Sequence, residues 1–428
     1  MHINGFSKLS KKDKIDWLLK NYLQNDAHAR KIITQYWHND QQLQELHDGF
    51  VENPVSNFYL PYAIAPNFFI DQKNFAVPMV VEESSVVAAA AKAAKFWAEK
   101  GGFSTEILGT IKPGHIHFTY DGATAEVIQF FRNNRKNIFS AIAGLQKNMQ
   151  KRGGGVKDIN LIDKTTAIDN YYQIEFKFET ADAMGANFIN SILEEAAELI
   201  TQKAKEELSG NLQIIMSILS NYTPESIVRA RVSCPVKDLK TPQLSGQEYA
   251  HKFLTAIEIA RKEPYRAVTH NKGIMNGIDA VVIATGNDFR AVEANVHAYA
   301  GKSGQYTSLS HASIENDLFN FWIDIPLAVG TVGGLTQLHP LVKFSLQLLQ
   351  NPTAKQLMRI MASVGLAQNF AAINSLITGG IQKGHMKMHL NNLLILLNAT
   401  PEERTFALQY FSDKKVSFSE LKNILNRN

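Results

Sequence analysis

The clearest hydrophobic pattern in the chain is a run of small apolar residues between Ser84 and Lys100. It begins with two serines, which are good helix N-caps, continues through alanines and other strong helix formers, and stops at Gly101-Gly102. This pattern predicts a helix. Because almost every side chain on one face is small, another backbone can approach that face closely, and we expect this helix to be buried at the centre of a domain.

Beyond Gly102 the pattern changes to alternating apolar and polar positions separated by long amphipathic stretches. Alternation with a period of two is typical of strands, and the amphipathic stretches are typical of helices. Two strand regions, each followed by a helix, with the helices on one face predict a compact α+β insert. The expected strands cover 103–110, 115–120 and 171–178, and the expected helices cover 123–149 and 182–208.

A mixed pattern returns after the insert and is expected to complete the domain that begins before it. From His339 onward nearly everything reads helical, and the Gly379-Gly380 pair is expected to join a small C-terminal lid to the rest. The expected strands are 227–236, 278–284 and 319–328, and the expected helices are 247–261 and 289–300. The predicted domains are a large domain of residues 1–110 and 220–377, an insert of residues 111–219 and a C-terminal segment of residues 378–428.

Composition narrows the class of protein. The chain has 428 residues, is 45% hydrophobic and carries a net charge of +4, which is small for this length and argues against a nucleic-acid carrier. Cys234 is the only cysteine, so an intrachain disulfide and a structural thiolate metal site are both excluded. The N-terminal residues lack the apolar segment of a signal peptide, and no apolar run approaches the ~20 residues of a membrane span. We therefore expect a soluble, cytoplasmic protein that binds no membrane.

Several familiar motifs are absent or incomplete. No Gly-x-Gly-x-x-Gly follows a strand, so a Rossmann dinucleotide site has no support. Gly301-Lys302-Ser303 imitates the end of a phosphate loop, but Val296 stands where the first glycine is required. His385 and His389 are four residues apart on a predicted helix, yet no third ligand is in view, so no metal is expected.

Three charged residues stand out because each lies among small or loop-forming residues. Lys272 belongs to an Asn- and Gly-rich stretch that predicts a loop ahead of strand 278–284, and Asp288 follows that strand. Glu83 precedes the alanine-rich helix; if that helix is buried, a low dielectric would raise the pKa of Glu83 and let it act as an acid. Each has a simpler explanation: a solvated lysine, a helix N-cap for Asp288, and a carboxylate that complements the helix dipole for Glu83.

Two further segments favour ligand binding through the backbone. Residues 182–187 connect a predicted strand to the long helix of the insert, and their small side chains leave the helix N-terminus accessible to a flat or anionic ligand. Residues 330–334 form a second glycine-rich loop with many exposed amides. Either segment alone is equally suited to a tight turn.

Taken together, these segments resemble the 3-hydroxy-3-methylglutaryl-coenzyme A (HMG-CoA) reductase family in its class II form. The resemblance extends from about residue 50 to 390 and depends on six motifs in the family's order. These are Glu83-Ser84-Ser85, Asp182 to Asn187, Arg266 to Gly273, Ala284 to Asp288, Gly330 to Gly334 and Gly384-His385-Met386. One departure is Ser84, where the class II pattern usually has proline.

The resemblance implies an α+β protein: a large mixed substrate-binding domain with a central buried helix, an inserted ferredoxin-like nicotinamide-cofactor domain and a helical C-terminal flap. It also implies a homodimer with active sites at the subunit interface. By resemblance, the catalytic residues are Glu83, Lys272, Asp288 and His385, and the substrate-binding residues are Ser85, Arg266 and Asn276. The cofactor-binding residues by resemblance are Asp182, Met184, Gly185, Asn187, Gly330, Thr331, Gly333 and Gly334.

The implied reaction interconverts HMG-CoA with mevalonate and coenzyme A by two hydride transfers from NADPH or NADH. Lys147 and Lys151 precede Arg152 in a region without an acid that could bind a ribose 2′-hydroxyl, which favours NADPH over NADH. The alternatives are another acyl-coenzyme A enzyme, such as a lyase or transferase, and a noncatalytic coenzyme A-binding protein. Cofactor oxidation on adding the thioester would separate these alternatives.

Overall fold

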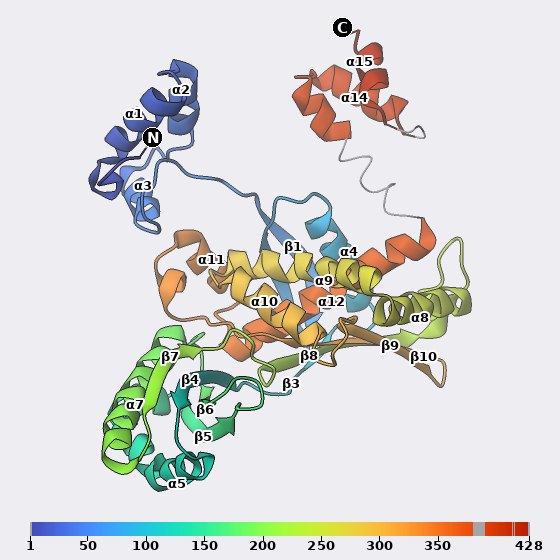
Figure 1. Cartoon of the computed structure of the whole chain (residues 1–428). Coiled ribbons are helices and arrows are strands. Elements are labelled where there is room, and N and C mark those ends of the chain that lie inside the picture. Colours follow the sequence, from blue (N-terminus) through green and yellow to red (C-terminus); the bar gives the residue numbers. More distant parts are fainter. Residues whose placement is uncertain (1, 380–389, 413, 415, 427–428) are drawn as a thin grey trace. The chain divides into compact units, whose positions relative to one another are not determined.

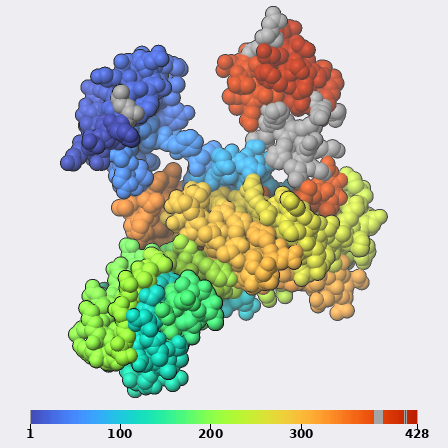
Figure 2. Space-filling view, viewed as in Figure 1, coloured from blue at the N-terminus to red at the C-terminus, as the bar shows by residue number. Residues whose placement is uncertain are grey.

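The computed structural model describes residues 2–379, 390–412, 414 and 416–426. Cα packing divides the chain into a unit of residues Met1–Pro61 and a unit of residues Tyr62–Asn428. The sequence pattern had predicted no boundary near residue 61. The N-terminal unit, blue in Figure 2, is helical, and the side chains of Ser10, Asp26 and Asp40 cap its three α-helices. Its elements are η1 (Phe6–Lys8), α1 (Lys11–Tyr22), α2 (Ala27–Gln35) and α3 (Gln41–Asp48).

The second unit begins with a hairpin that leads into the alanine-rich helix. Strands β1 (Tyr62–Ile70) and β2 (Lys73–Val80) pair antiparallel, and α4 (Val86–Ala98) follows. The helix is buried along Ala90, Ala94 and Trp97, as its small side chains predicted. The expected serine cap is not formed, because Ser85 takes a left-handed backbone with φ 74° and its side chain accepts no capping hydrogen bond.

A four-stranded antiparallel sheet in the order β3-β8-β10-β9 supports the large core. Helices α8 and α12 pack on this sheet, α9 packs on both of these helices and α10 packs on α9 (Figure 1). The strands are β3 (Ser104–Ile107), β8 (Ile227–Pro235), β9 (Ser310–Glu315) and β10 (Leu318–Pro326); the helices are η2 (Val236–Leu239), α8 (Gly246–Lys262), α9 (Pro264–Ala284), α10 (Phe289–Ala300), η3 (Gly334–Gln337), α11 (Pro340–Leu348) and α12 (Ala354–Thr378).

The prediction for the segment around Lys272 was wrong. The expected loop at 271–273 and the expected strand 278–284 are both parts of the single helix α9, which starts at Pro264 with Glu263 as its cap. The glycines serve close packing here. A side chain at Gly277 would put its Cβ 3.0 Å from Gln368 Cβ of α12, and one at Gly365 would put its Cβ 2.7 Å from the Ile278 side chain. Tertiary packing between α9 and α12 therefore overrides the local preference.

Buried polar side chains hold α9 in place. Asn271 donates to the carbonyl of Thr307 at 2.9 Å and accepts from the amide of Leu309 at 3.1 Å. Beside it, His270 Nε2 lies 2.7 Å from Ser310 Oγ, and Ser310 donates onward to Asn369 Oδ1 of α12 at 2.7 Å. The side chains of His270, Asn271, Ser310 and Asn369 are all buried, so the axial position and rotation of α9 are tied to the segment before β9 and to α12.

The inserted domain has the order β-α-β-β-α-β and a sheet in the order β5-β6-β4-β7, which is the ferredoxin-like arrangement. Helix α7 packs on one face of the sheet: a Cβ at Gly114 of β4 would lie 2.9 Å from both Ile189 and Leu193. The elements are β4 (Lys112–Tyr120), α5 (Thr124–Ala141), α6 (Ala143–Gln150), β5 (Gly155–Asp163), β6 (Tyr171–Glu179), α7 (Ala186–Glu207) and β7 (Leu212–Leu219).

Three expectations for the insert need correction. The helix expected at 123–149 is two helices, α5 and α6, and the helix expected at 182–208 starts only at Ala186 because Gly185, with φ 103°, sets its N-terminus. Strands β5 and β7 were not predicted at all. Their side chains alternate less cleanly because both lie at sheet edges, and Ile215 and Met216 of β7 are exposed.

Among the described residues of the second unit, three hydrophobic clusters form. The largest joins residues of the hairpin, α4 and the four-stranded sheet with α8, α9 and α12; a second fills the insert; a third joins Leu390 and Leu394 to α14 (Pro401–Tyr410) and α15 (Phe418–Ile424). Of the described residues, only α12 forms a helix long and apolar enough to cross a membrane, and 67% of its apolar window is buried in this protein core.

Burial of His270 predicts a pH-dependent loss of stability. Burial, assisted by the charge of Arg266, lowers the pKa of His270 to about 3. Below pH ~6.5 the unfolded chain therefore binds a proton at this position that the folded chain does not, so the free energy of unfolding falls as the pH falls. From pH 7 to pH 5 this group costs about 2 kcal/mol.

Urea unfolding of the wild type and of His270→Gln at pH 7, 6 and 5 measures this loss. The variant removes the group, and the other titrating residues are common to both proteins. We expect the wild type to lose about 2 kcal/mol more than the variant over this range. Parallel pH dependences of the two proteins would contradict the burial of a neutral His270.

Candidate active site

Glu83 lies in the turn between β2 and α4. The left-handed backbone of Ser85 ends this turn, and α4 starts at Val86 directly after it. Non-glycine residues with positive φ cost energy and cluster at functional sites, where the surrounding structure holds them. The Glu83 side chain is 38% exposed, so the condition for a buried acid, which the sequence had suggested, is not met in this structure.

Lys272 and Asn276 both reach Glu83. Lys272 Nζ donates to Glu83 Oε2 at 2.6 Å, and Asn276 Nδ2 lies 3.3 Å from the same oxygen. The two donors are four residues apart on α9 and therefore share one face of the helix. The turn and the helix, which are 189 residues apart in sequence at this contact, thus present a cation, an amide and a carboxylate at one point.

A cleft of about 370 Å³ opens beside this group, between the start of α4, the first half of α9 and the last half of α12. Glu83, Ser85, Arg266 and Asn276, all named from the sequence, line it. Its other polar lining residues are Ser84, Thr269, His270, Gln368, Asn369 and Ser375, and its apolar ones include Val86, Ala89, Ala371, Ala372 and Leu376. The three residues expected to bind substrate therefore face one cavity together with the expected acid.

A second group of ionisable residues, not expected from the sequence, lies one turn further along α9. Burial, together with the nearby Glu293 carboxylate, raises the pKa of Asp279, so Asp279 holds a proton at neutral pH. Burial alone would raise the pKa of Glu293, but the hydrogen bond from His297, the neighbouring Asp279 and the charge of Lys272 lower it. Glu293 Oε2 lies 2.6 Å from His297 Nε2, and His297 Nδ1 lies 2.6 Å from the hydroxyl of Tyr306.

A signal for this group exists in the sequence once α9 is known to be a helix. Lys272, Asn276 and Asp279 are spaced i, i+4 and i+7, which places them along one face. The expectation of a loop and a strand in this region hid the spacing.

Asp288 has the simpler of its two expected roles in this structure. Its carboxylate accepts from the amides of Arg290 and Ala291 at 3.0 and 3.2 Å and so caps α10, and Arg290 Nη2 lies 3.5 Å away. Within the part of the chain that the structure describes, no ion pair joins Asp288 to Lys272. The preceding residue connects this loop to the next one, because Asn287 Oδ1 accepts from the amide of Gly330 at 2.7 Å.

The two segments expected to bind the cofactor meet each other. The amide of Thr331 donates to the carbonyl of Asp182 at 2.8 Å, and Ala183 and Val332 form a parallel β-bridge. A Cβ at Gly330 would lie 2.4 Å from the Met184 nitrogen, so only glycine allows this approach. Residues 182–184 and 330–332, which lie far apart in the sequence, thus form one continuous backbone surface.

The structure offers a place for an anionic group at this surface. Helix α7 has 22 residues, and its N-cap residue Gly185 has no side chain with which to cap the first amides. The N-terminus of such a helix binds phosphate groups readily. Gly333 and Gly334 have φ values of 84° and 55°, which residues with a side chain rarely adopt, so no Cβ screens the amides of this loop. The residues present therefore fit the pyrophosphate of a dinucleotide. Asp182 itself is engaged elsewhere, since its Oδ1 accepts from the Ala354 amide at the start of α12 at 2.8 Å.

The expected catalytic residue His385 lies outside the described residues, as does His389, the other histidine of the incomplete metal motif. The structure therefore describes the catalytic candidates Glu83, Lys272 and Asp288, together with every expected substrate-binding residue. Among the described parts of the chain, no cluster of three His, Cys, Asp or Glu side chains is arranged to hold a metal ion.

Comparison with known proteins matches residues 14–390 to the family model for hydroxymethylglutaryl-coenzyme A reductase. A 3-hydroxy-3-methylglutaryl-coenzyme A reductase of Archaeoglobus fulgidus is 36% identical over 430 aligned positions, which cover 99% of this chain and 94% of that protein. A probable reductase of the same name from Borreliella burgdorferi is 33% identical and covers 92% of this chain and 89% of its own length.

Solved structures agree. The Streptococcus pneumoniae reductase superposes with a TM-score of 0.74 at 33% identity and covers 100% of this chain and 99% of its own. A class II structure of the S. pneumoniae enzyme, bound to NADPH in open conformations, matches equally well and covers 98% of this chain and 99% of its own. These matches confirm the α+β fold class and the oxidoreductase function expected from the sequence, and the chain belongs to the hydroxymethylglutaryl-coenzyme A reductase family.

Proposed function

We propose that this chain interconverts HMG-CoA with mevalonate and coenzyme A, with the acyl group held in the cleft beside Glu83 and Lys272. The observation that carries this proposal is the 2.6 Å pair between these two side chains at the cleft that Ser85, Arg266 and Asn276 also line. Arg266 is half-buried and offers a guanidinium, which binds a carboxylate with two parallel hydrogen bonds. We assign it to the free carboxylate of the acyl group, with Ser85 and Asn276 as neutral hydrogen-bond partners.

Reduction of a thioester builds negative charge on the carbonyl oxygen. The cofactor, when bound, supplies hydride to the carbonyl carbon twice per turnover. Lys272 would face the oxygen as a fixed cation, and one such contact contributes roughly 3 kcal/mol to stabilising the transition state. Glu83 holds the ammonium in place before substrate arrives, and Asn276 restrains Glu83 by donating to the same carboxylate oxygen.

Two protons must be delivered in one full reduction. The first goes to the coenzyme A thiolate as the hemithioacetal collapses, and we assign it to His385 by resemblance to the family. The second goes to the alkoxide that forms when the aldehyde is reduced, and we assign it to Glu83. Glu83 must carry a proton at that step, and because its side chain is 38% exposed it can recover this proton from solvent afterwards. We keep Asp288 as an electrostatic partner of this group at the start of α10.

The dinucleotide is proposed to lie along the joined surface of residues 182–187 and 330–334. Met184, Gly185 and Asn187 would contribute from the insert, and Gly330, Thr331, Gly333 and Gly334 from the large domain. We propose NADPH as the preferred cofactor because the exposed Lys147, Lys151 and Arg152 at the end of α6 can meet a 2′-phosphate. The NADPH-bound S. pneumoniae structure supports this choice.

The domain roles follow from these assignments. We propose that residues 1–110 and 220–377 bind substrate and form a homodimer, that residues 111–219 bind the cofactor and that residues 378–428 act as a flap. We further propose that the enzyme is cytoplasmic. A lyase or transferase would use the same cleft without oxidising a nicotinamide cofactor, so the absorbance of the reduced nicotinamide on mixing with HMG-CoA decides between them.

Removing the ammonium of Lys272 tests its role at the carbonyl. We expect Lys272→Ala to lower kcat roughly a hundred- to a thousandfold, because the oxyanion loses its preorganised cation. Lys262→Ala is the matched control, since this lysine on α8 is 75% exposed and pairs only loosely with Glu258, at 3.9 Å. Initial rates of NADPH oxidation measure both variants. A wild-type kcat in a folded Lys272→Ala protein would reject the assignment.

Separating the two reductive steps tests His385. We expect His385→Gln to lose reduction of the thioester while it still reduces free mevaldehyde, because only the first step releases a thiolate that needs a proton. Rates with HMG-CoA and with mevaldehyde are measured in parallel for the wild type and the variant. Equal loss of both activities would contradict the assignment of thiolate protonation to His385.

Comparison of the two nicotinamides tests the cofactor assignment. We expect kcat/KM to be at least about tenfold higher with NADPH than with NADH, which corresponds to about 1.4 kcal/mol. Lys151→Glu should narrow this ratio by repelling the 2′-phosphate, whereas Lys262→Glu on α8, outside the insert, should leave it unchanged. A wild-type preference for NADH would overturn the choice of NADPH.

A further inference from the structure

The turn at residues 180–184 belongs to the insert and is hydrogen-bonded to the large domain. On the large-domain side it is held by the Thr331 amide and the Ala354 amide, which donate to the carbonyl and carboxylate of Asp182, each at 2.8 Å. On the insert side it follows β6 and leads into α7. The conformation of this short segment therefore contributes to how the two domains meet and shapes the surface proposed for the dinucleotide.

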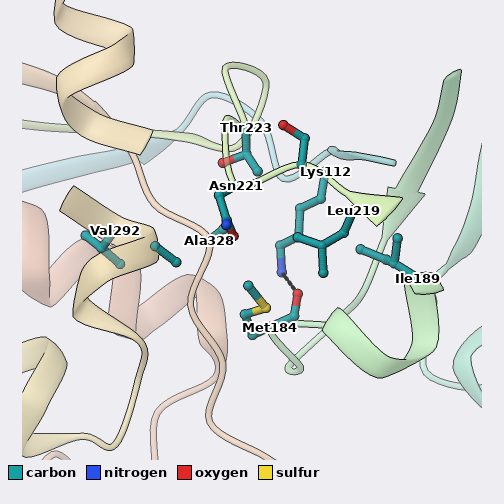
Figure 3. Close-up of a pocket in the computed structure, with 10 residues that line it drawn as sticks. Lys112, Met184, Ile189, Leu219, Asn221, Thr223, Val292 and Ala328 are labelled. Carbon is teal, nitrogen blue, oxygen red and sulfur yellow. Dashed lines mark hydrogen bonds between the residues drawn. The ribbon is translucent and has the colours of Figure 1, made fainter. Parts of the chain in front are cut away.

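Lys112 is the side chain that holds this turn from inside the insert. Its Nζ donates to Thr180 Oγ1 at 2.6 Å and to the carbonyls of Ala183 and Met184, both at 2.9 Å. Figure 3 shows the nitrogen directed at the Met184 carbonyl. Only 6% of Lys112 is exposed, so its ammonium is buried and all three of its hydrogens have partners in the turn.

These contacts decide the direction of the peptide groups. In a trans peptide the carbonyl and the following N–H point to opposite sides. Because the carbonyls of Ala183 and Met184 face Lys112, the N–H groups of Met184 and Gly185 are directed away from it. The Met184 nitrogen lies against Gly330, where a Cβ would come within 2.4 Å of it. One buried cation thus orients two amides toward the surface that residues 330–334 and the α7 N-terminus share.

We propose that Lys112 is a positioning residue for the nicotinamide dinucleotide, acting through the 180–184 turn, whose amides it directs toward the cofactor's phosphates. This inference rests on the proposed function of the joined surface. It assigns Lys112 no contact with the substrate or with the cofactor. It predicts that loss of the ammonium weakens cofactor binding and leaves the acyl cleft, formed by α4, α9 and α12, unaffected.

Near pH 8 Lys112 changes between its charged and its neutral form. Burial lowers its pKa to about 8, and Glu179 at the end of β6 is the charged neighbour that opposes this shift. The other elements that pack around the lysine face it with groups that do not titrate, namely Met184, Ile189, Leu219, Ser220, Asn221, Thr223, Ala291, Val292 and Ala328. A neutral amine has two hydrogens and cannot donate to three acceptors, so above pH 8 one acceptor of the turn loses its partner.

Lys112→Met tests the proposal, with Lys177→Met as the matched control. Lys177 is the residue in register with Pro113 on the neighbouring strand, and its ammonium pairs with Glu225 at 2.6 Å instead of with the turn. Without any cofactor, we expect amide hydrogen exchange of residues 181–187 to become faster in Lys112→Met only. We expect the Kd for NADPH, measured by fluorescence, to rise roughly ten- to a hundredfold, since buried turn acceptors are left unpaired.

In turnover, the KM for NADPH should rise in Lys112→Met by the same factor, while the KM for HMG-CoA stays within twofold of the wild type. Unchanged exchange of residues 181–187 and an unchanged Kd in a folded variant would overturn the proposal. An equal rise in both KM values would also overturn it, because it would mark a general structural defect. If instead the wild type itself failed to oxidise NADPH with HMG-CoA, the proposed function would be rejected. The exchange experiment, which needs no cofactor, would still test whether Lys112 holds the turn.

The wild type provides a second test that holds even if the variant does not fold. Between pH 7 and 9.5 we expect the Kd for NADPH to rise above pH 8, as the ammonium loses its proton. Lys177→Met should show the same rise, because its Lys112 is intact. A Kd that stays constant across this range would overturn the proposal.

Discussion

The fixed position and rotation of α9 are the constraint on which the rest of this structure depends. Asn271 and His270 tie the helix to the backbone before β9 and to α12 through hydrogen bonds that are shielded from water. Gly277 and Gly365 let α9 and α12 approach closely enough for these bonds to form. With its rotation fixed in this way, the helix must present Lys272 and Asn276 to the turn that carries Glu83.

The same helix connects the two halves of the site. Its first turns line the cleft proposed for the acyl group, and the residues after its C-terminal end hold the loop that begins at Gly330. With 21 residues at 1.5 Å each, α9 spans roughly 30 Å. A rigid element of that length can keep the lysine proposed to polarise the carbonyl and the backbone proposed to bind phosphate in a constant relation. Asn287, which accepts from the Gly330 amide, connects the segment after α9 to that backbone.

Backbone geometry has roles here that side chains fill in many other proteins. Ser85 has a left-handed conformation at the entrance to α4, Gly330 has no room for a Cβ, and Gly185 leaves the start of α7 without a side-chain cap. The buried Lys112 donates to the carbonyls of Ala183 and Met184, directly ahead of Gly185, and so orients these peptide groups. Such features depend on contacts between segments that lie far apart in sequence, so only their residue types, serine, glycine and lysine, are visible in the chain itself.

Local sequence signals alone determined the parts of this protein where interactions between neighbouring residues, such as helix propensity and capping, decide the structure. Alanines and a glycine stop specified α4, Asp288 marked the start of α10, and the family motifs pointed to the candidate site residues from their order along the chain. The helical nature of residues 271–284, strands β5 and β7, and the roles of Lys112, Asp279 and Glu293 were decided by tertiary structure. Asparagine, glycine and β-branched residues are weak helix formers, and only burial against α12 makes a helix of that segment the state of lowest free energy. The charges near it likewise acquire their protonation states from burial and from neighbours that the fold brings together.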